Sequence, residues 1–490
     1  MALMGKILKG SMVITVGEVV TQLCGLARNV ILARILTKAD FGVAALLAMT
    51  FQLMEIGGRL SIEHLIVQSK EGAHPRFVAV AHMVQAVLGL VSGILILMVA
   101  IPMADFYKVP GAIWAFQVVA VLPFLKALSH LDVSRMMREM RFGPGVMIEV
   151  ISQVAITVAA WPLAVTWPSY AVLVWLLLVR QVVATVASHL IAERPYRWAF
   201  DLGIVRSIFI FGWPMLISGL LLFAAMQGDR FAVGIRYSVS ELGVYAVAGT
   251  LALVPAATLM KLSGSIFLPL LSSTQDNPPM FIKRLAQVSE TLALFSALYA
   301  VVMILAGGPL VVLIFGAKYH DAAALTGWLG LGQALRLLRT VPTIASMARG
   351  DTKNLMFANI CRLSGLALAF PVAFAGASLW VIAACAAVGE LVALGGSFWR
   401  FSKLSQIPVK LHLPSWSLAG VFIGVSAILA WAGLPQLVPW IPLSGASLLI
   451  VGLVAAHLSI FKESRLLLVS TFAPLAKRFF RSANVRESNG

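Results

Sequence analysis

Residues 77–102 read FVAVAHMVQAVLGLVSGILILMVAIP and contain no Lys, Arg, Asp or Glu. A helix needs roughly 20 predominantly apolar residues to cross the hydrocarbon core of a bilayer, so this stretch is long enough to span a membrane. Polar joints that carry glycine and proline flank it, Glu71-Gly-Ala-His-Pro75 before and Lys108-Val-Pro-Gly111 after. We therefore predict one membrane-spanning helix over 77–102.

The same pattern, an apolar run closed by a polar joint, continues in both directions along the chain. It divides nearly the whole sequence into about fourteen predicted spans: 11–33, 41–66, 77–102, 111–131, 146–166, 169–192, 205–228, 243–271, 285–315, 321–347, 354–374, 376–399, 416–433 and 440–461.

The composition fits a chain built from such spans. Hydrophobic residues make up 60% of the 490 residues, charged residues make up 12%, and the mean hydropathy is +0.94. These values exclude a soluble domain of this length. Because the spans and their short loops use nearly all of the chain, little is left for an extramembrane catalytic domain. We expect an all-α polytopic membrane protein that is not an enzyme.

The distribution of basic residues predicts the orientation of the chain. If the amino terminus is cytoplasmic and each span reverses the side, 23 of the 37 Lys and Arg residues fall on the cytoplasmic side and six on the outer side. The positive-inside rule then places both termini in the cytoplasm. The same bias accounts for the net charge of +17, so nucleic acid is not expected as a partner.

Several kinds of chemistry have no sequence signal. Cys24, Cys361 and Cys385 lie in predicted spans and are odd in number, which argues against a disulfide framework. The sequence has no Gly-x-x-x-x-Gly-Lys-Ser/Thr loop for a nucleotide phosphate, and its eight histidines are scattered. We expect no catalytic residues, no cofactor and no metal.

A short repeat suggests that the chain consists of two related halves. Residues 37–43 (TKADFGV) and 238–244 (SVSELGV) align without a gap, and each has a hydroxyl residue followed three positions later by an acid. That arrangement is a capping box at a helix start. Because six spans separate the copies, the halves would be related by a pseudo-two-fold axis along the membrane normal. We expect four parts: a six-helix bundle in 1–200, a second in 201–400, two extra helices in 401–465, and a basic amphipathic cytoplasmic tail in 466–490.

Two stretches carry a resemblance to a known superfamily. Residues 33–43 (ARILTKADFGV) resemble the opening of bacterial polysaccharide exporters and O-antigen flippases, and residues 313–323 (LIFGAKYHDAA) are similar to a turn between spans 9 and 10 in the same group. This group belongs to the multidrug/oligosaccharidyl-lipid/polysaccharide (MOP) superfamily. The resemblance implies a flippase that moves an undecaprenyl-pyrophosphate-linked oligosaccharide across the bacterial inner membrane by alternating access, for cell-surface or exopolysaccharide biosynthesis.

Charges inside the spans are the candidate functional residues. A charged side chain near the bilayer centre costs about 2.5–3.5 kcal/mol on insertion scales, so it normally faces a partner or a wet cavity. Span 1 contains Glu18 and Arg28, span 8 contains Lys261, and span 2 contains Glu55, Arg59 and Glu63, which are spaced four residues apart on one helix face. Glu55 and Arg59 also have the spacing of an intrahelical ion pair, which would be a purely structural role.

The resemblance gives these charges possible roles. Related lipid II flippases use basic residues on spans 1, 2 and 8, which implies a cationic site for the substrate pyrophosphate at Arg28, Arg59 and Lys261. Guanidinium and ammonium groups suit phosphate oxygens. The acids Glu18 and Glu55 remain as cavity ion pairs or as a coupling-ion site.

Charges at the span ends complete the predictions. Asp229 and Arg230 end span 7, and we expect an outer gate there in which Asp229 pairs with Arg28. Arg336, Arg339 and Arg362 are expected to extend toward the lipid headgroups.

Two other functions compete with the flippase. An ion-coupled multidrug or toxin extruder of the same superfamily would need an acidic, cation-accepting cavity. A membrane polysaccharide polymerase or ligase would need a sizeable outer loop, whereas every predicted outer loop is short. The expected partners of a flippase are the lipid-linked oligosaccharide, membrane lipids, and the polysaccharide polymerase and glycosyltransferases of the same pathway.

Overall fold

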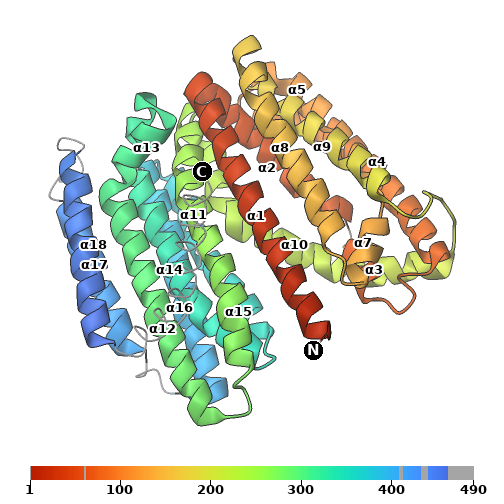
Figure 1. Ribbon diagram of the computed structural model, residues 1–490. Coiled ribbons are helices and arrows are strands. Elements are labelled where there is room, and N and C mark those ends of the chain that lie inside the picture. The colour runs from red at the N-terminus through yellow and green to blue at the C-terminus, as the bar shows by residue number, and fades with distance from the viewer. Residues whose placement is uncertain (1, 60–61, 408–411, 432–439, 462–490) are drawn as a thin grey trace, which may run out of the picture. The chain divides into compact units, whose positions relative to one another are not determined.

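The computed structural model describes residues 2–59, 62–407, 412–431 and 440–461, without the side chains of residues 2–12, 54–55, 57–59, 431 and 440–445. All regular structure in this part of the chain is helical (Figure 1). Eleven of the described helices are long and apolar enough to cross a membrane. The chain is therefore an all-α multi-pass membrane protein. The predicted tail over 466–490 lies outside the described residues.

Within the described residues, each of the fourteen predicted spans overlaps a helix or consecutive helices, and eleven of these meet the length and hydropathy of a membrane span. The first eight correspond to α1 (Ala2–Ile35), α2 (Lys38–Arg59) with α3 (Ile62–Gln68), α4 (Pro75–Phe106), η1 (Pro110–Ala112) with α5 (Ile113–Val119) and α6 (Val121–Ala127), α8 (Gly143–Thr166), α9 (Ala171–Ile191), α10 (Leu202–Arg236) and α11 (Val239–Ser272). A short helix that we did not predict, α7 (Asp132–Arg138), lies between α6 and α8.

The remaining six spans correspond to α12 (Pro278–Val301) with η2 (Val302–Ala306) and α13 (Gly307–Phe315), α14 (Ala323–Ala348), α15 (Lys353–Phe374), α16 (Leu379–Ser405), α17 (Leu413–Trp431) and α18 (Trp440–Ile460). The short η3 (Ala317–Ala322) joins α13 to α14. The segment η2 is a single π-helical turn. Pro309 explains it, because proline has no N–H to donate to the carbonyl oxygen of Leu305 four residues earlier, and its ring would clash with that carbonyl in a regular α-helix.

The chain divides into two compact units. Unit 1 comprises Met1–Val254, Val312–Ala322 and Leu366–Ile382, and unit 2 comprises Pro255–Val311, Ala323–Gly365 and Ala383–Gly490. These bounds differ from the expected division at residue 200, because two later segments pack with the first. The division into two six-helix bundles remains a prediction.

Small residues let the helices of unit 1 approach closely. In α4, a Cβ added to Gly89 would lie 2.3 Å from Ala127 Cβ, and one added to Gly93 would lie 2.7 Å from the Ala120 carbonyl oxygen. Close backbone approach through small residues is typical of helix packing in membranes. It holds α4 against α5 and α6, while α8 packs between α1 and α9.

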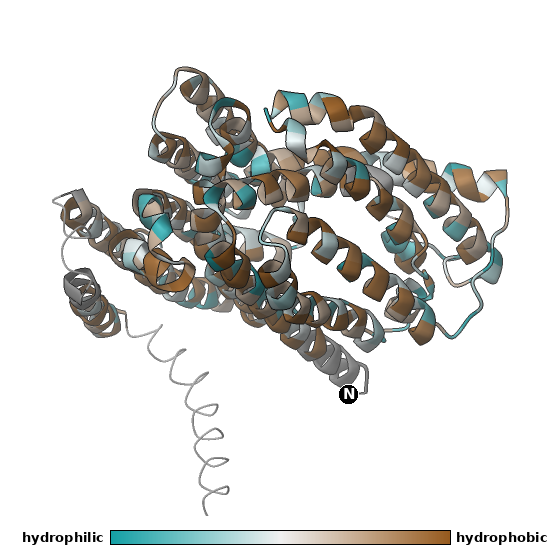
Figure 2. Ribbon diagram, turned by 90° about the horizontal axis from the view of Figure 1, so that it is seen from above, coloured by the Kyte–Doolittle hydropathy of each residue, from teal (hydrophilic) through white to brown (hydrophobic). Residues whose placement is uncertain are grey.

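In unit 2, α12 is the central helix. It packs against α14 and α17, and α17 packs against α18 (Figure 1). In both units hydrophobic residues run along the helices, whereas hydrophilic residues are frequent at the ends and in the loops (Figure 2). We call the end of unit 1 that holds the loops 69–74, 128–131 and 192–201 the N-terminal face, because α1 begins there, and the other end the far face.

Candidate functional site

Unit 1 encloses a cavity of about 800 Å³. Its wall comes from α1 to α4 and α6 to α10, so it lies among membrane-spanning helices. Many polar side chains line it: Glu18, Thr21, Glu63, His64, Gln85, Lys126, Ser129, His130, Ser134, Glu149, Arg180, Gln181 and Ser188. Ionisable groups among membrane-spanning helices normally face a partner or a water-filled cavity.

A chain of polar contacts connects three helices beside the cavity. Glu149 Oε1 on α8 accepts hydrogen bonds from Arg180 Nη2 on α9 at 2.8 Å and from Gln153 Nε2 at 3.2 Å. Gln153 Oε1 in turn accepts from Arg28 Nη1 on α1 at 3.3 Å. The chain therefore holds two guanidinium groups with one carboxylate, which leaves it with net positive charge.

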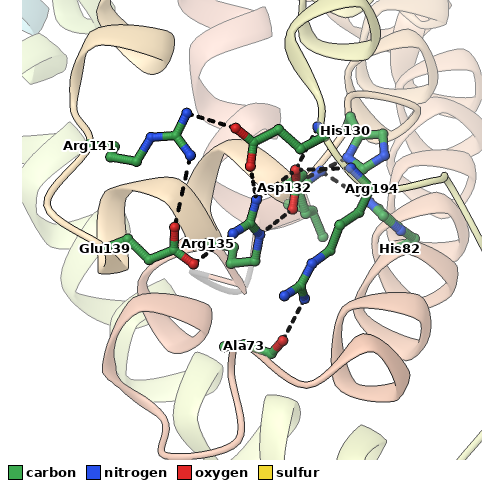
Figure 3. A network of polar contacts seen from close by, with 10 residues as sticks. Ala73, His82, His130, Asp132, Arg135, Glu139, Arg141 and Arg194 are labelled. Atoms are coloured by element: carbon green, nitrogen blue, oxygen red, sulfur yellow. Dashed lines mark hydrogen bonds and ion pairs between the residues drawn. The ribbon is translucent and has the colours of Figure 1, made fainter.

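At the N-terminal face a buried ion pair closes the bundle next to the cavity (Figure 3). Asp132 is completely buried, and Arg135 Nε donates to its Oδ1 at 2.5 Å. The backbone N–H groups of Glu193 and Arg194 donate to Asp132 Oδ2 at 2.9 and 3.3 Å. Asp132 thus fixes the connection between α9 and α10 to α7.

Further charges surround this pair on its exposed side. Arg135 also contacts Glu139 at 2.6 Å and Glu193 at 2.8 Å, and Arg141 contacts Glu193 at 2.7 Å (Figure 3). Burial acts to raise the pKa of Asp132, but the hydrogen bonds from Arg135 and the two backbone groups lower it below its usual value. The carboxylate is therefore charged at neutral pH.

Two neutral histidines lie directly behind the ion pair. The backbone N–H of Asp132 donates to His130 Nδ1 at 3.1 Å, and that of Leu131 donates to His82 Nε2 at 3.0 Å. A ring nitrogen that accepts a hydrogen bond carries no proton, so both rings are neutral in this arrangement. The ring centroids of His82 and His130 are 4.9 Å apart, which disfavours a charge on either.

These histidines predict that acid destabilises unit 1. Burial, followed by the neighbouring His189, lowers the pKa of His130 below its usual value near 6.5. Below that pH the unfolded chain binds protons that the folded chain does not, so stability falls as the pH falls. We expect the melting temperature of His130→Gln to fall less between pH 7 and 5 than that of the wild type, measured in detergent. The control is His320→Gln, at an exposed histidine on η3; equal acid sensitivity of the wild type and His130→Gln would contradict the assignment.

The far face brings the two copies of the sequence repeat into contact. The capping box at Ser238 is confirmed: the backbone N–H of Glu241 donates to Ser238 Oγ at 3.2 Å, and the backbone N–H of Ser238 donates to Glu241 Oε2 at 2.9 Å. At Thr37 the described contacts show one half of the box, in which the backbone N–H of Asp40 donates to Thr37 Oγ1 at 3.0 Å. A Cβ on Gly42 would lie 1.7 Å from the carbonyl oxygen of Val239, and a Cβ on Gly243 would lie 2.1 Å from that of Lys38. The starts of α2 and α11 therefore touch reciprocally, backbone to backbone.

The two stretches that carry the family resemblance interlock at the same face. Arg34 donates to the carbonyl oxygens of Leu313 and Ile314 at the end of α13, while Lys318 donates to those of Arg34 and Leu36 at the end of α1. Each cation thus caps the other segment's helix C-terminus. An ion pair of 2.6 Å between Lys38 and Asp321 adds a third connection.

The predicted gate residues have other partners than expected. Asp229 accepts a hydrogen bond from the Tyr245 hydroxyl at 2.7 Å, and a Cβ on Gly249 would meet the Arg230 guanidinium at 2.6 Å. Both side chains therefore face α11. Arg28 faces α8 instead, so within the described residues it forms no ion pair with Asp229.

The other predicted site residues are distributed over both units. Glu18 lines the cavity, and its Oε1 accepts from Gln22 Nε2 at 2.9 Å. Glu55 and Arg59 belong to α2, but their side chains are outside the described set. Lys261 is exposed in the part of α11 that belongs to unit 2. The structure brings Glu18 together with Arg180 and Lys126 in one cavity wall, and it leaves the proposed Arg28, Arg59 and Lys261 site a prediction.

Unit 2 contains a buried charge cluster that the sequence interpretation missed. Glu390 on α16 lies 2.7 Å from Arg362 Nε on α15 and 3.5 Å from Arg339 Nε on α14. The expectation that these arginines extend to the headgroups is wrong for Arg339 and Arg362, because their partner carboxylate is only 3% exposed. The sequence did contain a signal for this cluster, because Glu390 is the one acidic residue in the predicted span 376–399. Glu149 and Arg180 could have been found in the same way, because they are charged residues inside the predicted spans 5 and 6.

Metal-ligand chemistry has no support in the described ranges, where no group of three or more His, Cys, Asp or Glu residues is arranged to hold a metal ion. The cavity instead offers hydroxyl, amide, carboxylate and cationic groups. Such a surface binds polar groups through hydrogen bonds and charge.

Comparisons with known proteins agree with this arrangement. A family model described as "Polysaccharide biosynthesis protein" matches residues 31–324. The structure is similar to that of the lipid II flippase MurJ in an inward closed conformation, with a TM-score of 0.70 and 13% identity over 92% of this chain and 99% of that one. It is also similar to an inward-facing multidrug resistance MATE family transporter of the MOP superfamily, with a TM-score of 0.65 and 14% identity over 79% of this chain and 96% of that one. At this identity the likeness shows a shared fold. No curated protein sequence matches the chain.

Proposed function

The chain belongs to the polysaccharide biosynthesis protein family, and on that premise we propose that it is a flippase for a lipid-linked oligosaccharide. The substrate would be an undecaprenyl-pyrophosphate-linked oligosaccharide, moved from the inner to the outer leaflet of the bacterial inner membrane. Alternating access would move it for cell-surface or exopolysaccharide biosynthesis. The pathway's polymerase and glycosyltransferases would be its functional partners.

One observation carries this proposal: a cavity of about 800 Å³ among membrane-spanning helices, whose largely apolar wall carries charged, amide and hydroxyl side chains. Sugar hydroxyls both donate and accept hydrogen bonds. The wall carries amide, hydroxyl and carboxylate groups of the matching kind at Gln85, Gln181, Ser188 and Glu149, which in this structure are hydrogen-bonded within unit 1. A lipid tail needs no such wall, whereas a glycan crossing the bilayer does. The cavity therefore suits the sugar part of the substrate.

The pyrophosphate requires positive charge. Arg180 and Lys126 line the cavity, and Arg28 joins Arg180 through the polar chain described above. We assign binding of the substrate pyrophosphate to Arg28, Lys126 and Arg180. Arg59 and Lys261 are included because the resemblance to lipid II flippases implies basic residues on their spans. Guanidinium groups offer paired hydrogen bonds to phosphate oxygens.

Two further assignments belong to the proposal. Glu18, which lines the cavity, and Glu55 are assigned to ion coupling or to charge balance within the cavity. Asp229 and Arg230, which face α11, are assigned to the outer gate. The N-terminal face would be cytoplasmic, as would both termini, since basic residues are concentrated on that side of the sequence.

The reciprocal contact between Gly42 and Gly243 supports the two-bundle architecture. Both glycines occupy the same position in the sequence repeat, one turn into α2 and α11, and each faces the first residue of the other helix. A pseudo-two-fold axis along the membrane normal would pass between them.

One observation favours the multidrug extruder as a second candidate. Three glutamates, Glu18, Glu63 and Glu149, line the cavity beside two basic residues, Lys126 and Arg180. An acidic wall accepts cationic drugs. The two candidate functions predict different effects when the protein is lost. Loss of a flippase leads to accumulation of lipid-linked oligosaccharide, whereas loss of an extruder alters drug sensitivity.

A complementation experiment tests the proposal. Cells that lack the protein should accumulate lipid-linked oligosaccharide in the inner leaflet, and a wild-type copy should relieve the accumulation. Copies with Arg180→Ala or Lys261→Ala should export about 10–100-fold more slowly, because a hydrogen bond to a charged group contributes about 1.5–3 kcal/mol.

The control variant is Arg206→Ala, at an exposed arginine near the start of α10, which should restore export at equal protein abundance. Full export by both the Arg180→Ala and the Lys261→Ala copies would remove the cationic site from the proposal. Absence of accumulation together with altered drug sensitivity would favour the extruder.

A further inference from the structure

Three arginines and one glutamate meet inside unit 2, on three different helices. Arg336 and Arg339 lie one turn apart on α14, Arg362 lies on α15, and Glu390 lies on α16. Glu390 is 3% exposed and contacts Arg362 and Arg339 at 2.7 and 3.5 Å. Arg336 interacts electrostatically with both Glu390 and Arg362. The cluster has a net charge of +2.

The cluster lies at the midpoints of its helices. Arg336 is 13 residues from the start of α14 at Ala323 and 12 from its end at Ala348. At 1.5 Å per residue, either end is about 18–20 Å away along the helix axis, which is beyond the reach of an arginine side chain. Phosphate groups of the lipid surface therefore cannot neutralise these charges.

Several polar atoms of the cluster are left without hydrogen bonds. Arg336 Nη1 and Arg339 Nε are buried and have no hydrogen-bond partner among the described residues, and the same is true of both carboxylate oxygens of Glu390. The 3.5 Å contact from Arg339 to Glu390 is an ion pair, but too long for a good hydrogen bond. Buried charge is normally paired, because an unpaired ion in a low-dielectric interior loses its hydration without compensation.

Close helix packing holds the cluster rigidly. A Cβ on Gly365 would lie 2.8 Å from the Cα of Gly389, so α15 and α16 cross backbone to backbone next to Arg362 and Glu390. A Cβ on Gly332 would be 3.5 Å from the Cα of Ala387, which places α14 against α16. The helices that carry the guanidinium groups are therefore held close together, which favours a counter-ion at the cluster.

We propose that this cluster, named the mid-membrane arginine cluster, binds a small inorganic anion of halide size. The size follows from burial, because Glu390 and Arg339 have side chains only 3% and 5% exposed and leave no space for an organic group. The charge follows from the excess of two cations. Arg336 and Arg339 supply the hydrogen bonds, and Glu390 competes with the anion for them. The site is separate from the cavity of unit 1 and independent of the flippase proposal.

Chloride titration of the purified full-length protein in detergent tests the proposal. Sodium gluconate is replaced by sodium chloride at constant ionic strength, and thermal unfolding is followed by tryptophan fluorescence. A ligand that binds only the folded state raises the melting temperature in a saturable manner. We expect this response in the wild type, a response shifted to about tenfold higher chloride in Arg336→Gln, and one shifted to about tenfold lower chloride in Glu390→Gln.

The control variant is Arg400→Gln, which removes an arginine of unit 2 that is paired with Asp351 at 3.0 Å. It should keep the wild-type chloride response. Equal stability in chloride and gluconate, an equal change in all three variants, or a response to phosphate alone would overturn the proposal. If Arg336→Gln does not fold, crystals of the wild type in bromide provide a second measurement: an anomalous peak between Arg336 and Arg339 is expected, and its absence overturns the assignment.

Discussion

Replacing Asp132 by alanine should lower the free energy of unfolding of the protein by about 3–5 kcal/mol, the loss typical of breaking a buried ion pair from one side. Asp132 is completely buried and accepts four hydrogen bonds, two from Arg135 and two from the backbone of Glu193 and Arg194. Without it, Arg135 stays buried beside two half-exposed glutamates. The connection between α9 and α10 also loses its attachment to α7. Thermal and denaturant unfolding in detergent would measure the loss.

Asp201→Ala is the matched control. Asp201 caps the start of α10 through the N–H groups of Gly203 and Ile204, and it pairs with the exposed Arg76. Loss of such a cap typically costs about 1 kcal/mol. Equal destabilisation by the two alanine variants would show that burial of Asp132 contributes nothing beyond a surface carboxylate.

Replacing Gly42 by alanine should cost about 3 kcal/mol or more, at the upper end of overpacking effects. The added Cβ would lie 1.7 Å from the carbonyl oxygen of Val239 and 3.1 Å from the backbone nitrogen of Gly243. Both are backbone atoms at the start of α11, so no side chain can rotate to make space. The two helix starts must move apart, and we expect lower abundance in the membrane and a lower melting temperature.

Gly25→Ala is the control for this variant. Gly25 lies within α1, and a Cβ there meets no atom within 4 Å among the described residues. Alanine is the better helix former by about 1 kcal/mol, so this variant should be neutral or slightly stabilised. If Gly42→Ala behaves like Gly25→Ala, the contact between the two repeat copies is not tight in the folded protein.

Much of the fold was predictable because membrane-spanning helices can be located from the order of apolar and polar residues along the chain. Backbone groups in hydrocarbon must be paired within the helix, so apolar length alone locates the spans. The helix caps at Thr37 and Ser238 could also be predicted from the sequence, since such a cap depends on residues three positions apart. The membership of Val312–Ala322 and Leu366–Ile382 in unit 1 was not readable, because it depends on contacts between helices far apart in sequence.

The sites were harder to predict for the same reason. Charge inside a span marks a residue as important, and Glu18 indeed lines the cavity. The pairing of charged side chains depends on how each helix is rotated about its axis and shifted along it. A hydropathy pattern does not contain this information. Arg28 therefore meets Gln153 rather than Asp229, and Arg362 meets Glu390 rather than the headgroups. The buried Asp132 was missed because loop charges were counted only for orientation.

Unit 1 consists of three separate segments of the chain, so it cannot be completed until the last segment has been synthesised. Its first segment ends at Val254, but its last segment ends at Ile382. At about 5–20 residues per second, synthesis of the intervening chain takes on the order of ten seconds. Lys318 lies halfway along this intervening chain, so until it has been synthesised the carbonyl oxygens of Arg34 and Leu36 at the end of α1 lack the donor that contacts them in the folded protein. The nascent first segment is thus the stage at which quality-control proteases and insertion chaperones would meet this protein with its far face open.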